Sequence, residues 1–410
     1  MSIESCVITE KKPLLSVEAA QKRILAAILP LTETENLPLK QALGRVLAAP
    51  VYAVIHLPMA RNSAMDGYAF SSEHFAEKLT CVGTSWAGKT FAGELKKGEC
   101  VRIFTGAVLP ENTDSVVMQE LVSVHGAEIH FPFDVTLKQN VREIGEDVKA
   151  GDVLCQAKKT LSAIYLGLLA SAGIETVCVT RRLKIAYFST GDELVGLGKT
   201  LESGKIYDSN RYSLHGLLQN PNFEIFDGGV IADNKTLLKN TLLNAAENYD
   251  VIITTGGASV GEADFVKEVL AEIGEVNFWK IAIKPGKPLA FGKIGGCYFF
   301  GLPGNPVAVT TTFDIIVKPA LVQLSGGEWT KPFEFTAICS DKIKKSRGRQ
   351  EYQRGILSQR EDGQFEVLPM RRQGSHILSS ASRANCYIVL PADCENVQNG
   401  EAVTVLLFST

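Results

Sequence analysis

Three carboxylates and two lysines follow the ends of predicted strands in the second half of the sequence. The acids are Glu193, Asp233 and Asp264, and the lysines are Lys284 and Lys287. In open α/β sheets, ligands bind at the carboxyl ends of the strands. Carboxylates there can hold Mg²⁺, which in turn holds phosphate oxygens, and lysines neutralise the remaining charge. The pattern therefore predicts a magnesium and phosphate site with the three acids as metal ligands.

Each acid also has a purely structural interpretation. Asp264 precedes a predicted helix, and the N-cap is the commonest role for an Asp in that place, so both roles fit it equally well. Glu193 differs, because the turn Gly191-Asp192-Glu193 does not need a glutamate to form. The metal site depends on all three acids reaching one cleft.

A glycine-rich segment follows the most apolar predicted strand. Residues 250–255 run without polar alternation, which is typical of a strand buried on both faces. Gly256 and Gly257 end it, and Ser259 and Gly261 follow before the next helix. Glycines let backbone N–H groups approach a ligand, and helix N-termini bind anions. The spacing matches neither a P-loop nor G-x-G-x-x-G, so we predict an anion or nucleotide site of another kind.

Two Pro-Gly-x-Pro turns occur in the same region. The first spans residues 285–288, and the second is Pro303-Gly304-Asn305-Pro306. Proline fixes φ, so such a turn holds a loop still as well as reversing it. Both turns also fit a plain structural role.

The remaining candidates are weaker on spacing alone. Asp66, Thr105 and Asp147 lie in turns of the first half, and turn formation explains them better than chemistry does. The basic residues between 342 and 349 predict a solvated loop. The six histidines are dispersed, without metal-ligand spacing, and no Ser-His-Asp or Cys-His arrangement can be proposed.

The elements that must position the second-half residues alternate between strand and helix. The predicted strands are 183–188, 223–230, 250–255, 276–283 and 297–300, and the predicted helices are 210–218, 236–247, 264–273 and 307–324. This alternation predicts a doubly wound α/β domain over residues 181–328.

Shorter elements surround that domain. Helices are predicted at 16–29, 39–47 and 161–172, with short strands at 100–104, 115–118 and 128–133 between them. We therefore predict a β-rich domain (56–146) inserted into a discontinuous helical and extended linker domain (13–55 and 147–180). Residues 329–410 contain short alternating strands at 333–339, 365–368, 386–390 and 402–408, which predict a small β-barrel or sandwich.

Composition limits the function classes. The 410 residues are 45% hydrophobic and 21% charged, as in ordinary soluble multidomain enzymes. A net charge of −3 argues against a nucleic-acid-binding protein. The nine cysteines form no C-x-x-C pair, which favours reduced thiols in the cytoplasm. The polar N-terminus is no signal peptide, and the apolar segment 161–174 is too short to cross a bilayer of roughly 30 Å.

A series of motifs occurs in order between about residues 14 and 408. They are Asn62-Ser63-Ala64-Met65-Asp66-Gly67-Tyr68-Ala69, Thr105-Gly106-Ala107, Gly145-Glu146-Asp147, Ser189-Thr190-Gly191-Asp192-Glu193-Leu194, Ile206-Tyr207-Asp208-Ser209-Asn210, Gly256-Gly257-Ala258-Ser259-Val260-Gly261, Lys284-Pro285-Gly286-Lys287-Pro288 and Gly301-Leu302-Pro303-Gly304-Asn305-Pro306. Together they resemble the molybdopterin molybdenumtransferase family, which comprises the MoeA proteins and the gephyrin E domain. Ala258 stands where Val is usual, and His376 stands where the family often has a small residue; neither departure touches the acids or lysines.

The resemblance implies a fold and a reaction. The α/β domain would be MogA-like, and four-domain subunits would form an elongated homodimer, with each cleft between the α/β domain of one subunit and other domains of its partner. The enzyme would insert molybdate into adenylylated molybdopterin in a Mg²⁺-dependent reaction that releases AMP and gives molybdenum cofactor.

It also implies site residues. The positions similar to the family's functional set are Asp66, Thr105, Asp147, Glu193, Asp233, Asp264, Lys280, Lys284, Pro303 and Pro306. With the residues argued above, the expected substrate and nucleotide site comprises Gly256, Gly257, Ser259, Gly261, Lys287, Pro303, Gly304, Asn305 and Pro306. Because acids repel molybdate, Asp66 and Asp147 are expected to act from the partner subunit on metal, water or oxo-group protons.

Two other functions stay open at this point. A molybdopterin adenylyltransferase, itself an expected donor of the substrate, has a fold like the α/β domain, but the extra β domains and Asp66-Gly67-Tyr68-Ala69 favour the insertase. A scaffold that binds a partner protein, as the gephyrin E domain also does, would not need the acids to be kept.

Overall fold

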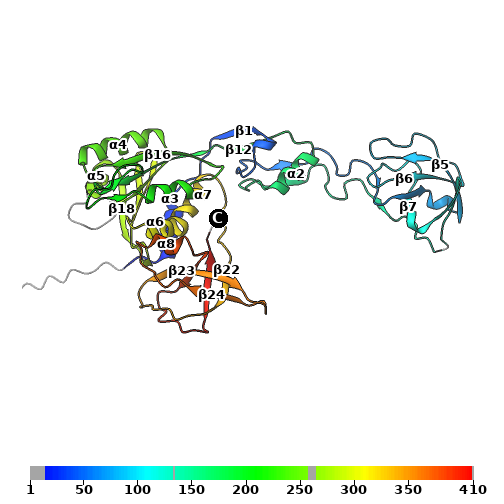
Figure 1. Ribbon diagram of the computed structural model, residues 1–410. Coiled ribbons are helices and arrows are strands. Elements are labelled where there is room, and N and C mark those ends of the chain that lie inside the picture. Colours follow the sequence, from blue (N-terminus) through cyan, green and yellow to red (C-terminus); the bar gives the residue numbers. More distant parts are fainter. Residues whose placement is uncertain (1–13, 133, 257–264, 409–410) are drawn as a thin grey trace, which may run out of the picture.

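The computed structural model describes residues 14–132, 134–256 and 265–408. The molecule is elongated: the α/β region and the C-terminal barrel lie at one end, a sheet of the first half lies at the other, and narrow two-stranded segments join them (Figure 1).

The α/β region is built on a six-stranded mixed sheet. In spatial order its strands are β16 (Phe223–Ile231), β13 (Leu183–Thr190), β17 (Val251–Thr255), β21 (Cys297–Leu302), β20 (Pro288–Ile294) and β18 (Glu275–Lys280). The first four strands are parallel, and β20 runs antiparallel to both β21 and β18. The prediction of a doubly wound α/β region is confirmed. The strand β20 was missed, because the proline turn before it suggested a loop.

Helices cover both faces of this sheet. Alternate residues of β13 point to opposite sides: Ile185 and Tyr187 pack with α1 (Val17–Ala27), α3 (Asn210–Leu217), α6 (Pro306–Thr312) and α7 (Lys318–Leu324). Ala186 and Phe188 pack with α4 (Lys235–Asn248) and α5 (Phe265–Ile273). A strand between two helical layers has apolar residues on both of its faces, as Ile185 to Phe188 do here.

One helix closes the region. It runs over Pro306–Leu324 and is long and apolar enough to cross a membrane, but 72% of its apolar window is buried inside the molecule, as in a core helix. A π-helical turn (Phe313–Val317) joins α6 to α7. Pro319 follows that turn and lacks an N–H, so the local change of winding accommodates a residue that cannot continue regular hydrogen bonding.

The C-terminal region is a closed five-stranded barrel. Its strands are β22 (Glu334–Cys339), β23 (Gln350–Gln359), β24 (Phe365–Pro369), β25 (Cys386–Leu390) and β26 (Ala402–Leu407), and β23 pairs with both β24 and β25 to close the ring. A short helix, α8 (Leu378–Ala381), precedes β25. The strand β19 (Ile283–Lys284) of the α/β region pairs in parallel with β23. The barrel is therefore fixed directly beside the sheet.

The first half forms the rest of the molecule. The far sheet has the order β7 (Ser115–Met118), β4 (Gly67–Phe70), β6 (Glu99–Ile103), β5 (Lys78–Ser85), β9 (Glu128–His130) and β8 (Ser123–His125), with short 3₁₀ turns at Ser72–His74 and Gln119–Leu121. Three antiparallel pairs connect it to the α/β region: β1 (Thr34–Pro38) with β12 (Thr176–Thr180), β2 (Val51–Tyr52) with β11 (Val153–Cys155), and β3 (Asn62–Ser63) with β10 (Val141–Arg142). The helix α2 (Ala163–Ser171) packs beside them.

The first half differs from the sequence-based prediction in one helix. The helix predicted at 39–47 is wrong: only a 3₁₀ turn, Leu39–Gln41, forms. Gly44 has a φ of +74°, and a Cβ there would lie 2.7 Å from Pro221, so the chain turns away from helical geometry at this point. The four domain boundaries given above stay a prediction.

Asp250, at the entrance to β17, gives a test of stability against pH. Its carboxylate accepts hydrogen bonds from Arg181 Nη1 at 2.7 Å and Nη2 at 2.9 Å, and from the Lys184 backbone N–H at 2.8 Å. Burial alone would raise the pKa of Asp250, but these bonds outweigh it, and the pKa lies below 3.8. A lowered pKa means that the stabilisation is complete above 3.8 and is lost as the pH falls through the folded-state value.

We therefore expect Asp250→Asn to reduce the free energy of unfolding by about 2 kcal/mol at pH 7, because bonds to a charged group are lost. The difference from the parent should shrink as the pH falls below 3.8, and it should vanish below the lower folded-state pKa, where the folded parent carboxylate is protonated as well. Urea unfolding at a series of pH values measures both, with the exposed Asp393→Asn as control. A deficit that is independent of pH would contradict the ionic origin.

Candidate functional site

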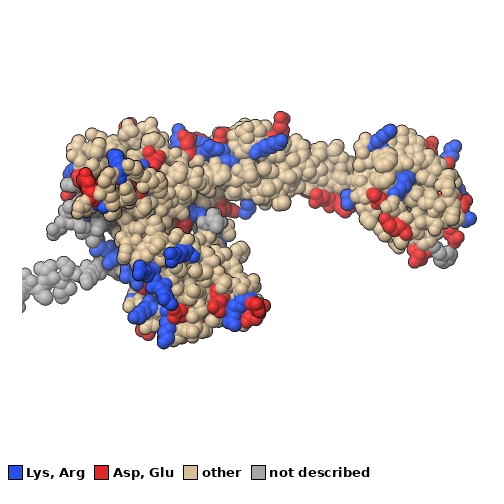
Figure 2. Space-filling model, in the orientation of Figure 1, with Lys and Arg blue, Asp and Glu red and all other residues tan. Residues whose placement is uncertain are grey.

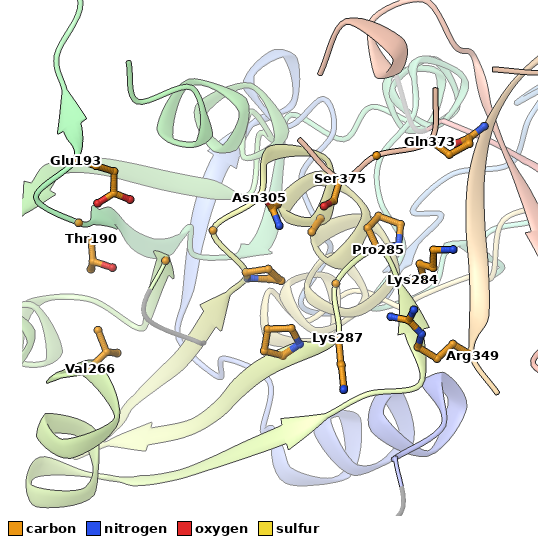
Figure 3. Close-up of a pocket in the computed structure, with 18 of the residues that line it drawn as sticks. Thr190, Glu193, Val266, Lys284, Pro285, Lys287, Asn305, Arg349, Gln373 and Ser375 are labelled. Carbon is orange, nitrogen blue, oxygen red and sulfur yellow. The ribbon is translucent and has the colours of Figure 1, made fainter. Parts of the chain in front are cut away.

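A cleft of 670 Å³ opens where the α/β sheet meets the barrel. It lies at the carboxyl ends of β13, β17 and β21, where ligand sites in such sheets are found. Its lining residues are Thr190, Gly191, Glu193, Asp233, Gly256, Val266, Lys284, Pro285, Gly286, Lys287, Pro288, Pro303, Gly304, Asn305, Ala308, Arg349, Gln373, Gly374 and Ser375. Figure 3 shows Thr190 and Glu193 on one side of the cleft, with Lys284, Arg349 and Gln373 on the opposite side.

One wall of the cleft carries carboxylates. Glu193 lies in the loop after β13, next to the short parallel pair β14 (Leu194–Val195) and β15 (Ile206–Tyr207), and Asp233 follows β16. The two loops are tied together, since Asp233 N–H donates to Asp192 Oδ1 at 3.0 Å. Gly191 has a φ of +137°, a backbone conformation that residues with a Cβ rarely adopt, so the turn before Glu193 favours glycine. Both Glu193 and Asp233 are exposed to the cleft.

The opposite wall carries cations. Lys284 and Lys287 come from the first Pro-Gly-x-Pro turn, and Arg349 comes from the segment just before β23. The Lys284 ammonium lies 3.0 Å from the Glu351 carboxylate, which is buried in the barrel. Arg349 belongs to the run predicted as a solvated loop, and that prediction is wrong for this residue and for the buried Lys345. Pairing of β19 with β23 brings this segment to the cleft.

Backbone loops form the floor between the walls. Gly256 has a φ of +86°, and a Cβ there would lie 2.7 Å from the Thr190 carbonyl oxygen, so only glycine lets the two loops meet. The second proline turn contributes Pro303, Gly304 and Asn305. It is held in place by Asn210 Nδ2, which donates to the Gly304 carbonyl at 2.7 Å. The floor presents backbone rather than side chains, as an anion or nucleotide site requires.

A loop of the barrel, residues 373–375, completes the cleft and was not predicted. The buried guanidinium of Arg354 donates to the carbonyls of Arg372 at 2.9 Å and Gly374 at 3.2 Å. Val307 N–H donates to the Ser375 carbonyl at 3.0 Å, which ties the loop to α6. Gln-Gly-Ser carries no spacing signal for chemistry, so packing of the barrel alone reveals it.

Two of the three predicted metal ligands line the same cleft. Glu193 and Asp233 share the cleft, and hard oxygen donors of this kind suit Mg²⁺. Asp264, Gly257, Ser259 and Gly261 lie outside the described residues. Within the described ranges, three His, Cys, Asp or Glu side chains nowhere come together as a metal site. The three-acid site stays a prediction.

Two further predicted residues lie at the margin of the cleft. Lys280 ends β18, and its carbonyl accepts from Leu15 N–H at 3.0 Å. Pro306 is the first residue of α6. Neither lines the cleft. Their predicted roles are untested.

The first-half residues are not brought to this cleft. Asp66 and Thr105 lie in the far sheet, at the opposite end of the molecule (Figure 1). The N–H and hydroxyl of Thr105 donate to Asp66 Oδ1 at 2.8 and 2.7 Å and hold the pKa of Asp66 below 3.8. Asp147 is exposed between β10 and β11. One chain alone therefore keeps these residues apart from Glu193 and Lys284.

The charged side chains of the visible face are distributed differently over the barrel and over the far sheet. Figure 2 shows Lys and Arg gathered over the barrel and its junction with the α/β region, while both signs are mixed over the far sheet. A cleft beside basic surface attracts anionic ligands.

Known proteins resemble the chain along its length. Family models match as the MoeA N-terminal region (domain I and II) over residues 15–173, the probable molybdopterin binding domain over 186–323 and the MoeA C-terminal region (domain IV) over 336–408. The molybdopterin molybdenumtransferase of Haemophilus influenzae is 44% identical, covering 97% of this chain and 99% of that protein. That of Nostoc sp. is 35% identical, covering 91% and 88%. The crystal structure of the molybdopterin biosynthesis MoeA protein of Pyrococcus horikoshii superposes with a TM-score of 0.83 at 30% identity, covering 96% of this chain and all of that one.

Proposed function

The chain belongs to the MoeA family of molybdopterin molybdenumtransferases, and we propose that it inserts molybdate into adenylylated molybdopterin with release of AMP. It is a transferase of molybdenum cofactor biosynthesis. The observation that carries the proposal is the division of the cleft into a carboxylate wall and a cationic wall across a glycine floor. The two anionic parts of the reaction, a pyrophosphate and an oxoanion, need such a division.

The carboxylate wall is proposed to hold Mg²⁺ through Glu193 and Asp233, with Asp264 as the third ligand. Bound there, Mg²⁺ would neutralise charge on the pyrophosphate as AMP leaves. The hydrogen bond from Asp233 N–H to Asp192 Oδ1 ties the loops of the two carboxylates together, which supports a shared cation site.

The cationic wall is proposed to receive the anions. Lys284, Lys287 and Arg349 can each donate to a phosphate or molybdate oxygen, and Arg349 can do so in a bidentate manner. The predicted amides of the Gly256 to Gly261 segment and the 303–305 turn would face the nucleotide. Lys280 is proposed to act from the edge of this wall.

A second copy of the chain is proposed to complete each cleft. Asp66 and Thr105 lie at the far end of an elongated subunit, so a homodimer is the arrangement that lets them meet Glu193 and Lys284. We propose that Asp66 and Asp147 then position metal, water or oxo-group protons. The lowered pKa of Asp66 keeps its carboxylate ionised near neutral pH, so it can accept a hydrogen bond or hold a cation.

We also propose a cytoplasmic location, receipt of the substrate from a molybdopterin adenylyltransferase, and the four domain boundaries given above. The reduced state of the cysteines fits the first, since the eight that the structure describes are all unpaired.

One assay tests the reaction. The purified protein is given adenylylated molybdopterin and Mg²⁺, with or without molybdate, and AMP release and molybdenum cofactor are measured. We expect AMP release that depends on molybdate and no consumption of ATP when molybdopterin is offered with ATP. ATP consumption without molybdate-dependent AMP release would instead identify an adenylyltransferase. Capture of a protein partner with neither reaction would identify a scaffold.

A further inference from the structure

Lys284 stands on the cationic wall, but its ammonium is not held by any other residue of that wall. It contacts Glu351, whose Oε1 lies 3.0 Å from Nζ. The Lys284 side chain is 44% exposed and the Glu351 side chain only 3%, so the ion pair has one end in the cleft and the other in the barrel. Glu351 does not line the cleft itself.

The Glu351 carboxylate is fixed from both sides. Its other oxygen, Oε2, accepts from Gln353 Nε2 at 2.8 Å, and Gln353 is itself buried. Alternate residues of a strand share a face, so Glu351 and Gln353 point the same way from β23. Both neighbours of the carboxylate are hydrogen-bond donors, and the carboxylate accepts from each of them with a separate oxygen.

The backbone sets the register of this pair. β19 and β23 pair in parallel with Lys284 opposite Glu351, and Gln350 N–H donates to the Ala282 carbonyl at 2.8 Å. This strand pairing joins the α/β region to the barrel. The pairing of β19 with β23 therefore places the Glu351 carboxylate beside Lys284 and also brings the barrel to the cleft.

We infer that Glu351 is a positioning residue for the reaction, which holds the Lys284 ammonium at the cationic wall in the orientation used for the anionic substrate. This inference rests on the proposed function. A lysine has many side-chain rotamers, and a fixed partner for one of its three protons removes that freedom before the substrate binds. The other two protons stay available to the cleft. Glu351 touches no substrate and acts only through Lys284.

The inference predicts a loss in turnover rather than in binding. In Glu351→Gln, Lys284 keeps its positive charge, so the ground-state attraction for anions persists. The ionic partner that aligns the ammonium is lost, and the new amide NH₂ faces one of the two donors that the carboxylate accepted from. We expect kcat for molybdate-dependent AMP release to fall about tenfold, with KM for adenylylated molybdopterin no higher than in the parent. Glu334→Gln is a matched control, since Glu334 forms an ion pair with Lys331 in the same barrel, outside the cleft.

A double-mutant cycle distinguishes positioning from a structural effect. The proteins are the parent, Glu351→Gln, Lys284→Gln and the double variant, assayed for AMP release with thermal unfolding measured for each. If Glu351 acts through Lys284, Glu351→Gln should cause less than about a twofold further loss in the Lys284→Gln background. The same tenfold loss in both backgrounds, or a loss that follows a lowered unfolding midpoint, would overturn the inference.

Full activity of Glu351→Gln beside an impaired Lys284→Gln would overturn it while leaving the proposed function intact. Full activity of Lys284→Gln would remove the proposed role of Lys284 and the inference together.

Discussion

Glu193→Gln should reduce molybdate-dependent AMP release by about 10²–10³-fold, the size of effect seen when a main electrostatic contact to a transition state is removed. Glutamine has nearly the same shape as glutamate but carries no charge, and it is a poor ligand for Mg²⁺. Asp233→Asn should act in the same direction, because its carboxylate shares the wall and its loop is tied to that of Glu193. The measurement is the rate of AMP release from adenylylated molybdopterin at saturating molybdate.

Magnesium dependence gives this prediction a second readout. If Glu193 binds the ion, the Mg²⁺ concentration for half-maximal activity should rise in Glu193→Gln, and excess Mg²⁺ should restore part of the rate. Glu202→Gln is the matched control, since Glu202 is exposed in the same part of the chain but lies outside the cleft. An unaltered Mg²⁺ requirement in Glu193→Gln would mean that the ion binds elsewhere.

Mixed dimers give the second large effect. Asp66→Asn and Glu193→Gln should each be nearly inactive alone, because every cleft of either homodimer lacks one carboxylate. When the two variants are unfolded together and refolded as a mixture, half of the dimers should be mixed, and each mixed dimer should have one intact cleft. The mixture should therefore recover about a quarter of the parent activity.

Controls separate recovery from simple addition. Mixing the folded variants without exchange of subunits should give no more than the sum of their residual activities. Asp66→Asn mixed with Asp147→Asn should recover nothing if both acids come from the same subunit, because each cleft then needs both from one chain. Full activity of Asp66→Asn on its own would dispose of its role in the reaction.

The sequence could predict the α/β sheet because its strands obey a simple rule. A strand buried on both faces lacks polar alternation, and residues 185–188 and 251–253 are apolar and buried at every position. The loops that follow such strands lie at a single edge of the sheet, which predicts that Glu193 and Asp233 lie close together. The strand β20 was not predicted because its first residue is Pro288, and a proline in that place indicates a turn.

The residues that the barrel contributes to the cleft could not be predicted from a hydrophobic pattern. β23 contains three buried polar residues: Glu351 and Gln353, which bond to each other, and Arg354, which bonds to the loop over residues 372–374. A hydrophobic pattern cannot reveal a strand whose inward residues are charged, because their burial depends on partners from distant segments. Arg349 and residues 373–375 were missed for the same reason. The distant Asp66 and Thr105 were named only through the family resemblance.

The three antiparallel pairs between the α/β region and the far sheet have a mechanical consequence. At each of them only two strands carry the connection, and two-stranded ribbons twist and bend more readily than broad sheets. The far sheet, whose strand β4 directly follows Asp66, is thus joined to the α/β region through a series of two-stranded ribbons that starts at β1 and β12. Stiffening or shortening these ribbons should alter how far the far sheet reaches without changing the far sheet or the cleft. Substitutions in the ribbons can therefore govern turnover from positions that contact no ligand.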